Sequence, residues 1–161
     1  MNLKSQVEWA LHCCAILAGL PANRYLSTKV LAEFHGLPKE YLSKALQSLS
    51  QASIVESTLG PTGGYRLAKL PSEISFLDII EAVEGKSRTF VCTEIRRNNP
   101  CRSADHCETK PCHIARIMWE ADEEWRKKLR SVLLSDLTAM LDEDLPAELR
   151  EKSFEWLLAR T

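Results

Sequence analysis

The segment from residue 27 to residue 68 restricts the fold more than any other part of the chain. Ser27 or Thr28 can cap a short helix that continues through Phe34. Residues 35–37, with glycine in the middle, predict a tight turn, and Pro38 suits the first turn of a following helix that ends near residue 52. This order of helix, glycine turn and helix is typical of a helix-turn-helix unit.

A β-hairpin is expected directly after this unit. Residues 53–57 and 65–68 have the composition of two short strands, and the Gly-Pro-Thr-Gly-Gly run at 60–64 predicts the turn between them. A hairpin that follows a helix-turn-helix is the arrangement of a winged helix. The fold class predicted is therefore mainly α with a small β-hairpin, a winged helix-turn-helix domain plus a long dimerisation helix.

Amphipathic helices are predicted on both sides of this core unit, over residues 3–19, 71–84 and 146–159, with a longer one starting at Ile114. The apolar stripe of the longer helix extends beyond what a small domain can bury, so we expect a seam between two copies of the chain. Packing of this helix on its own domain is the alternative. The chain then divides into a winged-helix DNA-binding domain at 1–85, a cysteine-containing ligand loop at 86–113, a dimerisation helix region at 114–141 and a C-terminal helix at 142–161.

Composition narrows the class of protein. The 161 residues are 45% hydrophobic and 27% charged, a globular balance without an apolar run of membrane-spanning length. The first residues lack the pattern of a secretory signal, so a cytoplasmic location is expected, where cysteines are free thiols or ligands. Residues 1–72 hold seven lysines and arginines against four glutamates, a balance of +3 that suits DNA contact in the first half.

The second helix of the helix-turn-helix unit should present its first exposed residues to the major groove. The glycine-rich hairpin tip offers backbone amides and a cation for phosphate or a narrow minor groove. A solvated helix face would explain the same lysines without DNA. The candidate DNA-binding residues are Thr28, Lys39, Glu40, Tyr41, Ser43, Lys44, Thr62, Gly63, Gly64, Tyr65 and Arg66.

Four cysteines, Cys92, Cys101, Cys107 and Cys112, fall within 21 residues of a polar stretch. That density indicates a metal, a cluster or a redox reaction. The wide spacing fits zinc poorly, since structural zinc sites usually present pairs two to four residues apart. An iron–sulfur cluster held by Cys101, Cys107 and Cys112 stays open, as do inert thiols.

Glu8 and His12 form a second group of candidate ligands, because residues four apart project from one face of a helix. They interrupt an otherwise apolar segment, where a buried Glu or His needs a partner such as a metal. A hydrogen bond between the two side chains, or partial exposure, would also explain them. Neighbouring Cys13 and Cys14 are expected to fill the core.

The chain resembles the IscR/NsrR family of winged-helix bacterial transcription regulators up to about residue 141. The resemblance is carried by the helix-turn-helix LAEFHGLPKEYLSKALQSLSQASIVES, the wing GPTGGYRLA, the helix ISFLDIIEAVEG, the cysteine loop and LLSDL. It implies a homodimer that binds double-stranded operator DNA. In many members of this family a cluster senses iron–sulfur status, nitric oxide or redox state.

A closer likeness is to the RsrR-type redox regulators, whose signatures VEWALHCC and FVCTEIR stand at residues 7–14 and 90–96. This resemblance implies a [2Fe–2S] cluster bound by Glu8, His12, His35 and Cys92, contributed by both subunits. We therefore expect a dimeric regulator that senses redox or iron–sulfur status. The alternative is a winged-helix regulator without a cluster that responds through cysteine thiols or a partner protein. A thiol-dependent enzyme is disfavoured, because the chain has no Cys-x-x-Cys motif.

Overall fold

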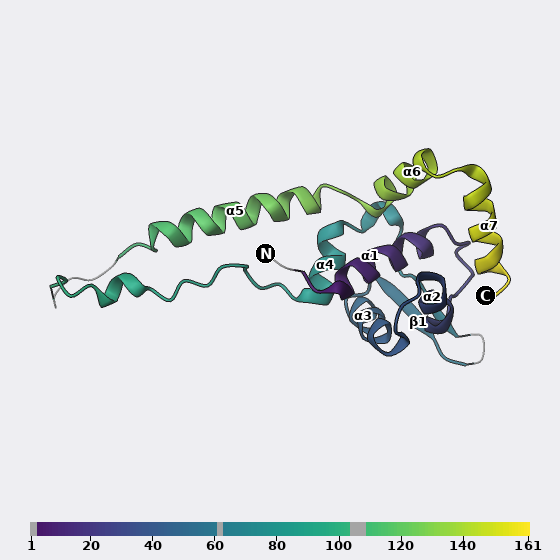
Figure 1. Cartoon of the computed structure of the whole chain (residues 1–161), viewed down its shortest axis with the longest axis horizontal. Coiled ribbons are helices and arrows are strands. Elements are labelled where there is room, and N and C mark those ends of the chain that lie inside the picture. The colour runs from purple at the N-terminus through teal and green to yellow at the C-terminus, as the bar shows by residue number, and fades with distance from the viewer. Residues whose placement is uncertain (1–2, 61–62, 104–108) are drawn as a thin grey trace.

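A helical body and a long arm make up the chain (Figure 1). The computed structural model describes residues 3–60, 63–103 and 109–161. We call residues 3–85 and 131–161 the body, and residues 86–130 the arm. The described residues contain seven α-helices and a two-stranded antiparallel sheet, which confirms the predicted fold class. No helix in these ranges is both long and apolar enough to cross a bilayer.

The helix-turn-helix unit forms as predicted, from α2 (Thr28–His35) and α3 (Lys39–Gln51). The Ser27 hydroxyl caps α2 by accepting a hydrogen bond from the backbone N–H of Val30 at 3.2 Å. Gly36 ends α2 in the left-handed region at φ 64°, a conformation that glycine adopts without steric cost. Local signals in the sequence are therefore sufficient to define this unit.

Helix α1 (Ser5–Ala18) lies at the centre of the body and packs against α3 and α4. Its inward face includes Cys13 and Cys14, both with no exposed surface, as expected for core residues. Burial raises the pKa of the Cys13 thiol to about 12, so this thiol stays protonated and unreactive. The core around α1 is built mainly from leucines of α2 and α3: Leu31, Leu42, Leu46 and Leu49.

The predicted hairpin is formed by β1 (Val55–Thr58) and β2 (Gly64–Leu67), which pair in antiparallel register. A third stretch of chain joins its edge, because Leu26 and Tyr65 exchange both backbone hydrogen bonds at 2.8 and 3.0 Å. A Cβ atom at Gly64 would lie 2.4 Å from the Leu26 carbonyl oxygen. The close approach of these two backbones therefore requires glycine at position 64.

The single helix predicted for residues 71–84 is wrong in one respect. It is split into a 3-10 turn at Pro71–Glu73 and α4 (Phe76–Glu84). Ser75 caps α4 and forms a capping box with Asp78. The break exists because Ile74 is extended and accepts a hydrogen bond at 2.8 Å from the N–H of Leu134, far along the chain.

The predicted dimerisation region at 114–141 contains two helices. Helix α5 (His113–Arg130) belongs to the arm, whereas α6 (Leu134–Asp144) returns to the body. Leu134 is fully buried there. Helix α7 (Ala147–Leu158) follows, and its Trp156 packs against Phe34 of α2 with the ring centroids 5.6 Å apart.

The arm is a hairpin-like structure in which residues 86–103, including a 3-10 turn at Ile95–Asn98, run alongside α5 (Figure 1). Its base is fixed to the body by Arg126, whose guanidinium donates to the Glu81 carboxylate of α4 at 2.7 Å. Along the arm, the Asp122 carboxylate accepts a hydrogen bond from the Thr89 hydroxyl at 2.9 Å. These contacts hold the arm away from the body.

Candidate ligand cluster and nucleic-acid interface

Glu8 and His12 lie on one exposed face of α1, as their spacing predicts. No hydrogen bond joins the two side chains in the described part of the chain. The partial exposure considered from the sequence is therefore observed, and the hydrogen bond is not. Both side chains are free to bind a third group.

His35 comes close to this face although it lies 23 residues beyond His12. The two imidazole rings are 5.6 Å apart between centroids. The Nε2 atom of His35 is buried and has no hydrogen-bond partner in the described residues. Burial and the neighbouring His12 lower the pKa of His35, which favours the neutral imidazole that binds metals.

An orphaned buried nitrogen beside a second imidazole is an arrangement that a metal can satisfy. Two histidines also replace two cysteines on one iron in some [2Fe–2S] centres, so these donors fit an iron–sulfur cluster. Among the described residues of a single chain, however, no three His, Cys, Asp or Glu side chains gather as a metal site. The body therefore supplies only part of a ligand set.

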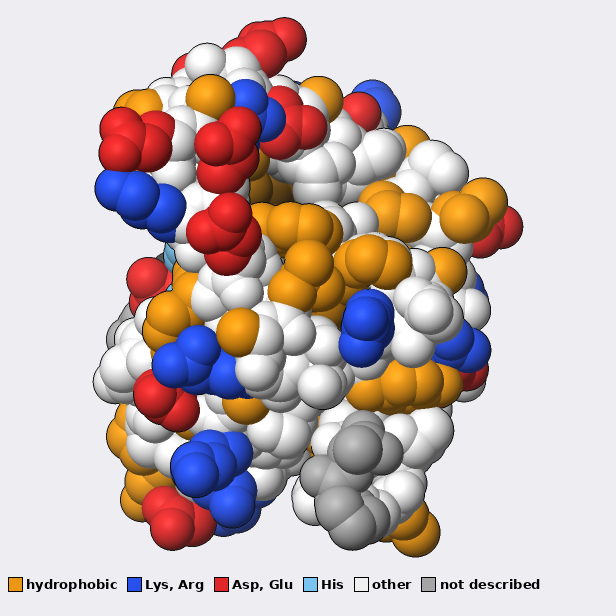
Figure 2. Space-filling model, turned by 90° about the vertical axis from the view of Figure 1, so that its right-hand side faces the viewer, with side chains coloured by type: hydrophobic (Ala, Val, Ile, Leu, Met, Phe, Trp, Pro, Cys, Tyr) orange, Lys and Arg blue, Asp and Glu red, His pale blue; other side chains and the backbone are white. Residues whose placement is uncertain are grey.

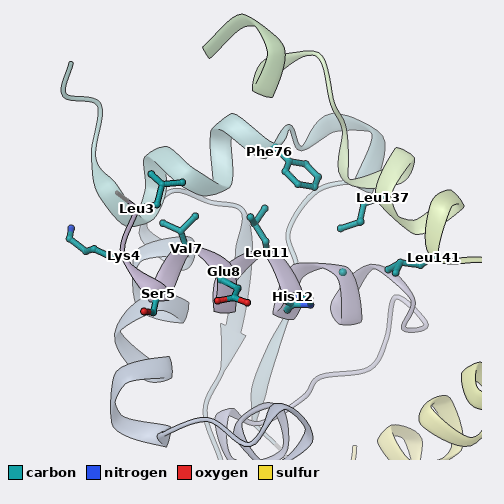
Figure 3. A pocket seen from close by; sticks show the side chains of 11 residues that line it. Leu3, Lys4, Ser5, Val7, Glu8, Leu11, His12, Phe76, Leu137 and Leu141 are labelled. Atoms are coloured by element: carbon teal, nitrogen blue, oxygen red, sulfur yellow. The ribbon is translucent and has the colours of Figure 1, made fainter. Parts of the chain in front are cut away.

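An apolar groove of about 440 Å³ borders Glu8 and His12 (Figure 3). Helix α1 forms its floor, and α4 and α6 form its walls. In Figure 3 Leu3, Val7 and Leu11 point toward α4, while Glu8 and His12 lie along the opposite edge. The groove is lined mainly by Leu3, Val7, Leu11, Phe76, Leu137 and Leu141.

Cys92 lies on the arm, far from the histidines of the same chain. Its sulfur accepts a hydrogen bond from the Glu94 N–H at 3.4 Å. Cys92 also lies close to Cys112 at the start of α5. The apolar pair Phe90 and Val91 before it does not hold Cys92 against the body, since Val91 is 79% exposed. The sequence alone gave no sign that the extended strand of the arm pairs with α5.

Cys112 precedes α5, and the backbone N–H groups of Ala115 and Ile114 donate to its sulfur. These two hydrogen bonds, together with the bond from Cys92 and the charge of Arg96, lower the pKa of the Cys112 thiol. Cys101 is exposed nearby. Cys107 lies outside the described residues, so the geometry of a three-cysteine site is not defined.

The predicted DNA-reading helix α3 places Lys39, Glu40, Tyr41 and Lys44 on its exposed side, with Ser43 half-buried. Tyr41 is 55% exposed, and the Lys44 ammonium lies 5.7 Å from the centroid of its ring. Thr28, half-buried, begins α2 beside this surface. At the end of the body away from the arm, Lys and Arg side chains gather in the lower part, and acidic ones predominate in the upper part (Figure 2).

The hairpin residues divide into two groups. Gly63 and Gly64 are required by close backbone contacts, Tyr65 joins the edge of the sheet, and Thr62 lies outside the described residues. Arg66 does not extend from the tip, since it pairs with Glu56 and donates to the Ala22 carbonyl. Its guanidinium also lies 4.8 Å from the Tyr25 ring centroid. These contacts give Arg66 a structural role within the sheet.

Leu59 was not selected from the sequence, although it stands fully exposed where the hairpin turns. Apolar side chains at such positions can enter a minor groove. Nothing in the composition of the turn marks Leu59, because its exposure follows from the direction in which β1 leaves the body.

Helix α5 turns its apolar side chains toward solvent. Ile114, Ile117 and Met118 are 64%, 64% and 40% exposed, whereas the charged Asp122 is buried. The side of the helix that faces its own chain includes the fully buried Ala115 as well as Asp122, and these three exposed apolar side chains lie on the outer side. Exposed apolar side chains grouped in this way commonly mark a protein interaction surface.

Comparison with known proteins gives consistent results. The family model Rrf2, described as iron-dependent transcriptional regulator, matches residues 3–140. The chain is 33% identical over 138 residues to protein rrf2 of Nitratidesulfovibrio vulgaris, covering 85% of this chain and 87% of that protein. It is 26% identical over 156 residues to the HTH-type transcriptional regulator NsrR of Shouchella clausii, covering 96% and 99% of the two chains. The solved structure of T. potens IscR is similar in fold, with a TM-score of 0.67 and 21% identity over 94% of this chain and 96% of that chain.

Proposed function

Because the chain belongs to the Rrf2 family of transcriptional regulators, we propose that it is a homodimer that senses redox or iron–sulfur status through a [2Fe–2S] cluster. Membership of this family confirms the expected resemblance, and it makes the chain a DNA-binding regulator of transcription rather than an enzyme. The dimer, the cluster and a cytoplasmic location are the parts that we propose.

The separation of Cys92 from the histidines is the observation that supports the proposal most directly. Cys92 lies close to Cys112, at the outer end of α5. The 18 residues of α5 span about 27 Å before the chain re-enters the body, where His12 and His35 lie. One chain cannot bring these ligands together in this conformation. In a twofold dimer, the arm of one subunit can supply Cys92 to the other subunit.

The groove and the exposed side of α5 support the same arrangement. The groove beside Glu8 and His12 is mainly apolar and open, and the outer side of α5 carries the exposed Ile114, Ile117 and Met118. Placing the arm of a second subunit over the groove would bury both surfaces. It would also bring Cys92 of that arm toward the edge that carries Glu8 and His12.

In the proposed dimer, Glu8, His12 and His35 of one body and Cys92 of the opposite arm hold the cluster. When bound, a [2Fe–2S] cluster supplies a reversible one-electron change of charge. His35 is the last residue of α2, and only residues 36–38 separate it from α3. Fixing the His35 imidazole therefore fixes the turn between the two helices that read DNA.

This position of His35 connects the ligand site with the DNA-reading helix. We expect operator affinity to differ between the oxidised and reduced states by about 1–3 kcal/mol, the usual size of an allosteric coupling. Equal affinities in the two states would remove the sensing part of the proposal. They would leave the DNA-binding function unchanged.

Anaerobic purification followed by visible absorption, iron and sulfide assays tests the cluster. We expect Cys92→Ala to abolish the chromophore, because this residue is the only thiolate in the proposed set. Cys101→Ala is the matched control, since it removes a different thiol, an exposed one, from the same arm, and it should keep most of the chromophore. If Cys92→Ala stays coloured while Cys101→Ala and Cys112→Ala are colourless, the three-cysteine set holds the cluster instead. A colourless wild-type protein that still binds DNA would favour a regulator without a cluster.

A further inference from the structure

The backbone leaves the direction of the arm open at the point where the arm joins the body. Gly85 ends α4 with φ 88°, in the left-handed region that glycine enters and leaves at little cost. On the return, residues 132–134 are hydrogen bonded to residues 74–76 of the body, but only after α5 has ended at Arg130. Side-chain contacts at this joint must therefore fix the direction in which the arm extends (Figure 1).

The joint is incompletely packed. A hollow of about 230 Å³ lies between the body and the arm. Leu3, Ile80 and Glu84 line it from the body, and Ser87, Thr89 and Trp125 line it from the arm. Side chains that border a hollow lose packing contacts on that side, so apolar packing restrains the arm weakly here. Polar contacts beside the hollow have to supply more of the restraint.

The Arg126 guanidinium connects three parts of the joint. It donates to the Glu81 carboxylate of α4 at 2.7 Å, and its Nε atom lies 3.6 Å from the Asp122 carboxylate. Asp122 in turn accepts a hydrogen bond at 2.9 Å from Thr89, on the strand that leaves the body. The Arg126, Glu81 and Asp122 side chains are 13%, 17% and 5% exposed, so water and salt screen these charges little.

Neighbouring charged side chains do not share this arrangement. Arg130, one turn further along α5, pairs with Glu123 of the same helix, and the two side chains are 57% and 63% exposed. The Lys86 ammonium lies 3.9 Å from the Glu81 carboxylate, but the side chain is 83% exposed. Exposed pairs of this kind contribute little to stability. Arg126 is thus the cation with the geometry and burial to fix the joint.

We propose that Arg126 is a positioning residue that sets the direction in which the arm leaves the body. It thereby determines which part of a second subunit the outer end of the arm, with Cys92, can reach. This consequence rests on the proposed function, whereas the role of Arg126 in the joint does not. Without the guanidinium, the Glu81 and Asp122 carboxylates would remain little exposed and lose their shared cation, which disfavours the observed joint. The arm should then take several directions while the body stays folded.

The test measures the distance between arm and body in full-length protein without its cluster. Nitroxide labels are attached through unnatural amino acids at Gln51 on α3 and Glu120 on α5, both exposed. Excess unlabelled chain ensures that a dimer holds at most one labelled chain. Pulsed electron paramagnetic resonance should give one narrow distance distribution for the wild-type chain, and Arg126→Met should lose the narrow peak. An unchanged distribution in Arg126→Met would overturn the proposal.

Three further variants separate positioning from general destabilisation, with circular dichroism confirming that each is folded. Arg130→Met is the matched control and should keep the narrow peak, because its ion pair lies within α5. Arg126→Lys retains a cation and should recover part of the peak. Glu81→Gln weakens the same contact from the body and should broaden the distribution. Equal broadening in Arg130→Met, or none in Glu81→Gln, would contradict a joint fixed by Arg126.

Cluster retention separates this proposal from the one on which its consequence rests. Wild-type and Arg126→Met protein are loaded with iron and sulfide, and the loss of visible absorbance to a chelator is followed. The variant should lose its cluster about tenfold faster, the usual size of effect for residues that support metal ligands. Equal rates beside a lost narrow peak would refute the consequence for Cys92 and leave the joint standing. A wild-type protein that takes up no cluster would refute the proposed function, and the distance measurement would still decide the role of Arg126.

Discussion

Mixed dimers test whether the two subunits share each cluster. One chain carries Cys92→Ala and its partner carries His12→Ala, with different affinity tags so that only the mixed dimer is purified. In the shared arrangement, one site combines an intact body with an intact arm, and the other site has lost both ligands. A twofold dimer should then keep one of its two clusters, although neither variant holds any cluster as a homodimer.

The expected cluster content of the mixed dimer follows from the geometry of the arm. With α5 about 27 Å long, Cys92 at its outer end cannot exchange between the two bodies by a small rotation of its side chain. Iron, sulfide and absorbance per dimer should therefore be half those of the wild-type protein. Exchange of the arms would instead give cluster contents that vary between none and the full wild-type value. The assay is iron and sulfide analysis of the doubly purified mixed dimer.

A reciprocal dimer provides the control. When Cys92→Ala and His12→Ala are both placed in one chain and the partner is wild type, sharing predicts no complete site and hence no cluster. Ligands drawn from a single chain predict the reverse, with no cluster in the first mixed dimer and half in the second. That reversed pattern would refute the shared site.

Two further predictions concern DNA contact and stability. Lys39→Ala or Lys44→Ala should weaken binding to a labelled duplex in fluorescence anisotropy and lower the slope of log affinity against log salt concentration by about 1, as expected for a lost phosphate contact. Lys152→Ala on α7 is the control and should leave this slope unchanged. An unchanged slope for both α3 variants would exclude the contact. Leu134→Ala should lower the free energy of unfolding in urea by about 2–5 kcal/mol, since this side chain has no exposed surface. A half-exposed leucine of α7, Leu149, is the matched control, and equal losses for the two would show that α6 does not anchor in the core.

Much of the body could be predicted from the sequence because its signals are local. Ser27 as a helix cap and Gly36 in the left-handed region both act within a few residues of their positions. The break before α4 was missed for the opposite reason. The capping box of Ser75 and Asp78 is visible in the sequence, but the extended Ile74 is explained only by its pairing with Leu134.

The ligand residues show the same difference. Glu8 and His12 share a helix face by spacing alone, whereas the approach of His35 to His12 depends on how α2 packs against α1. Arg66 looked like a free cation at a hairpin tip, yet its partners Glu56 and Ala22 come from other segments. The position of Cys92 beside Cys112 depends on the fold of residues 86–112, which have no periodic pattern.

The path of the arm has a consequence for how such a chain can diversify. The chain leaves the body after Gly85, and on its return the Leu134 N–H donates a hydrogen bond to the Ile74 carbonyl. The whole arm is therefore one insertion between α4 and α6 of the body. Changes far from the base, in the number or spacing of cysteines, need no repacking of the leucine core. One DNA-reading body can thus carry arms with different chemistry, and new sensors can be engineered by exchanging the outer part of the arm alone.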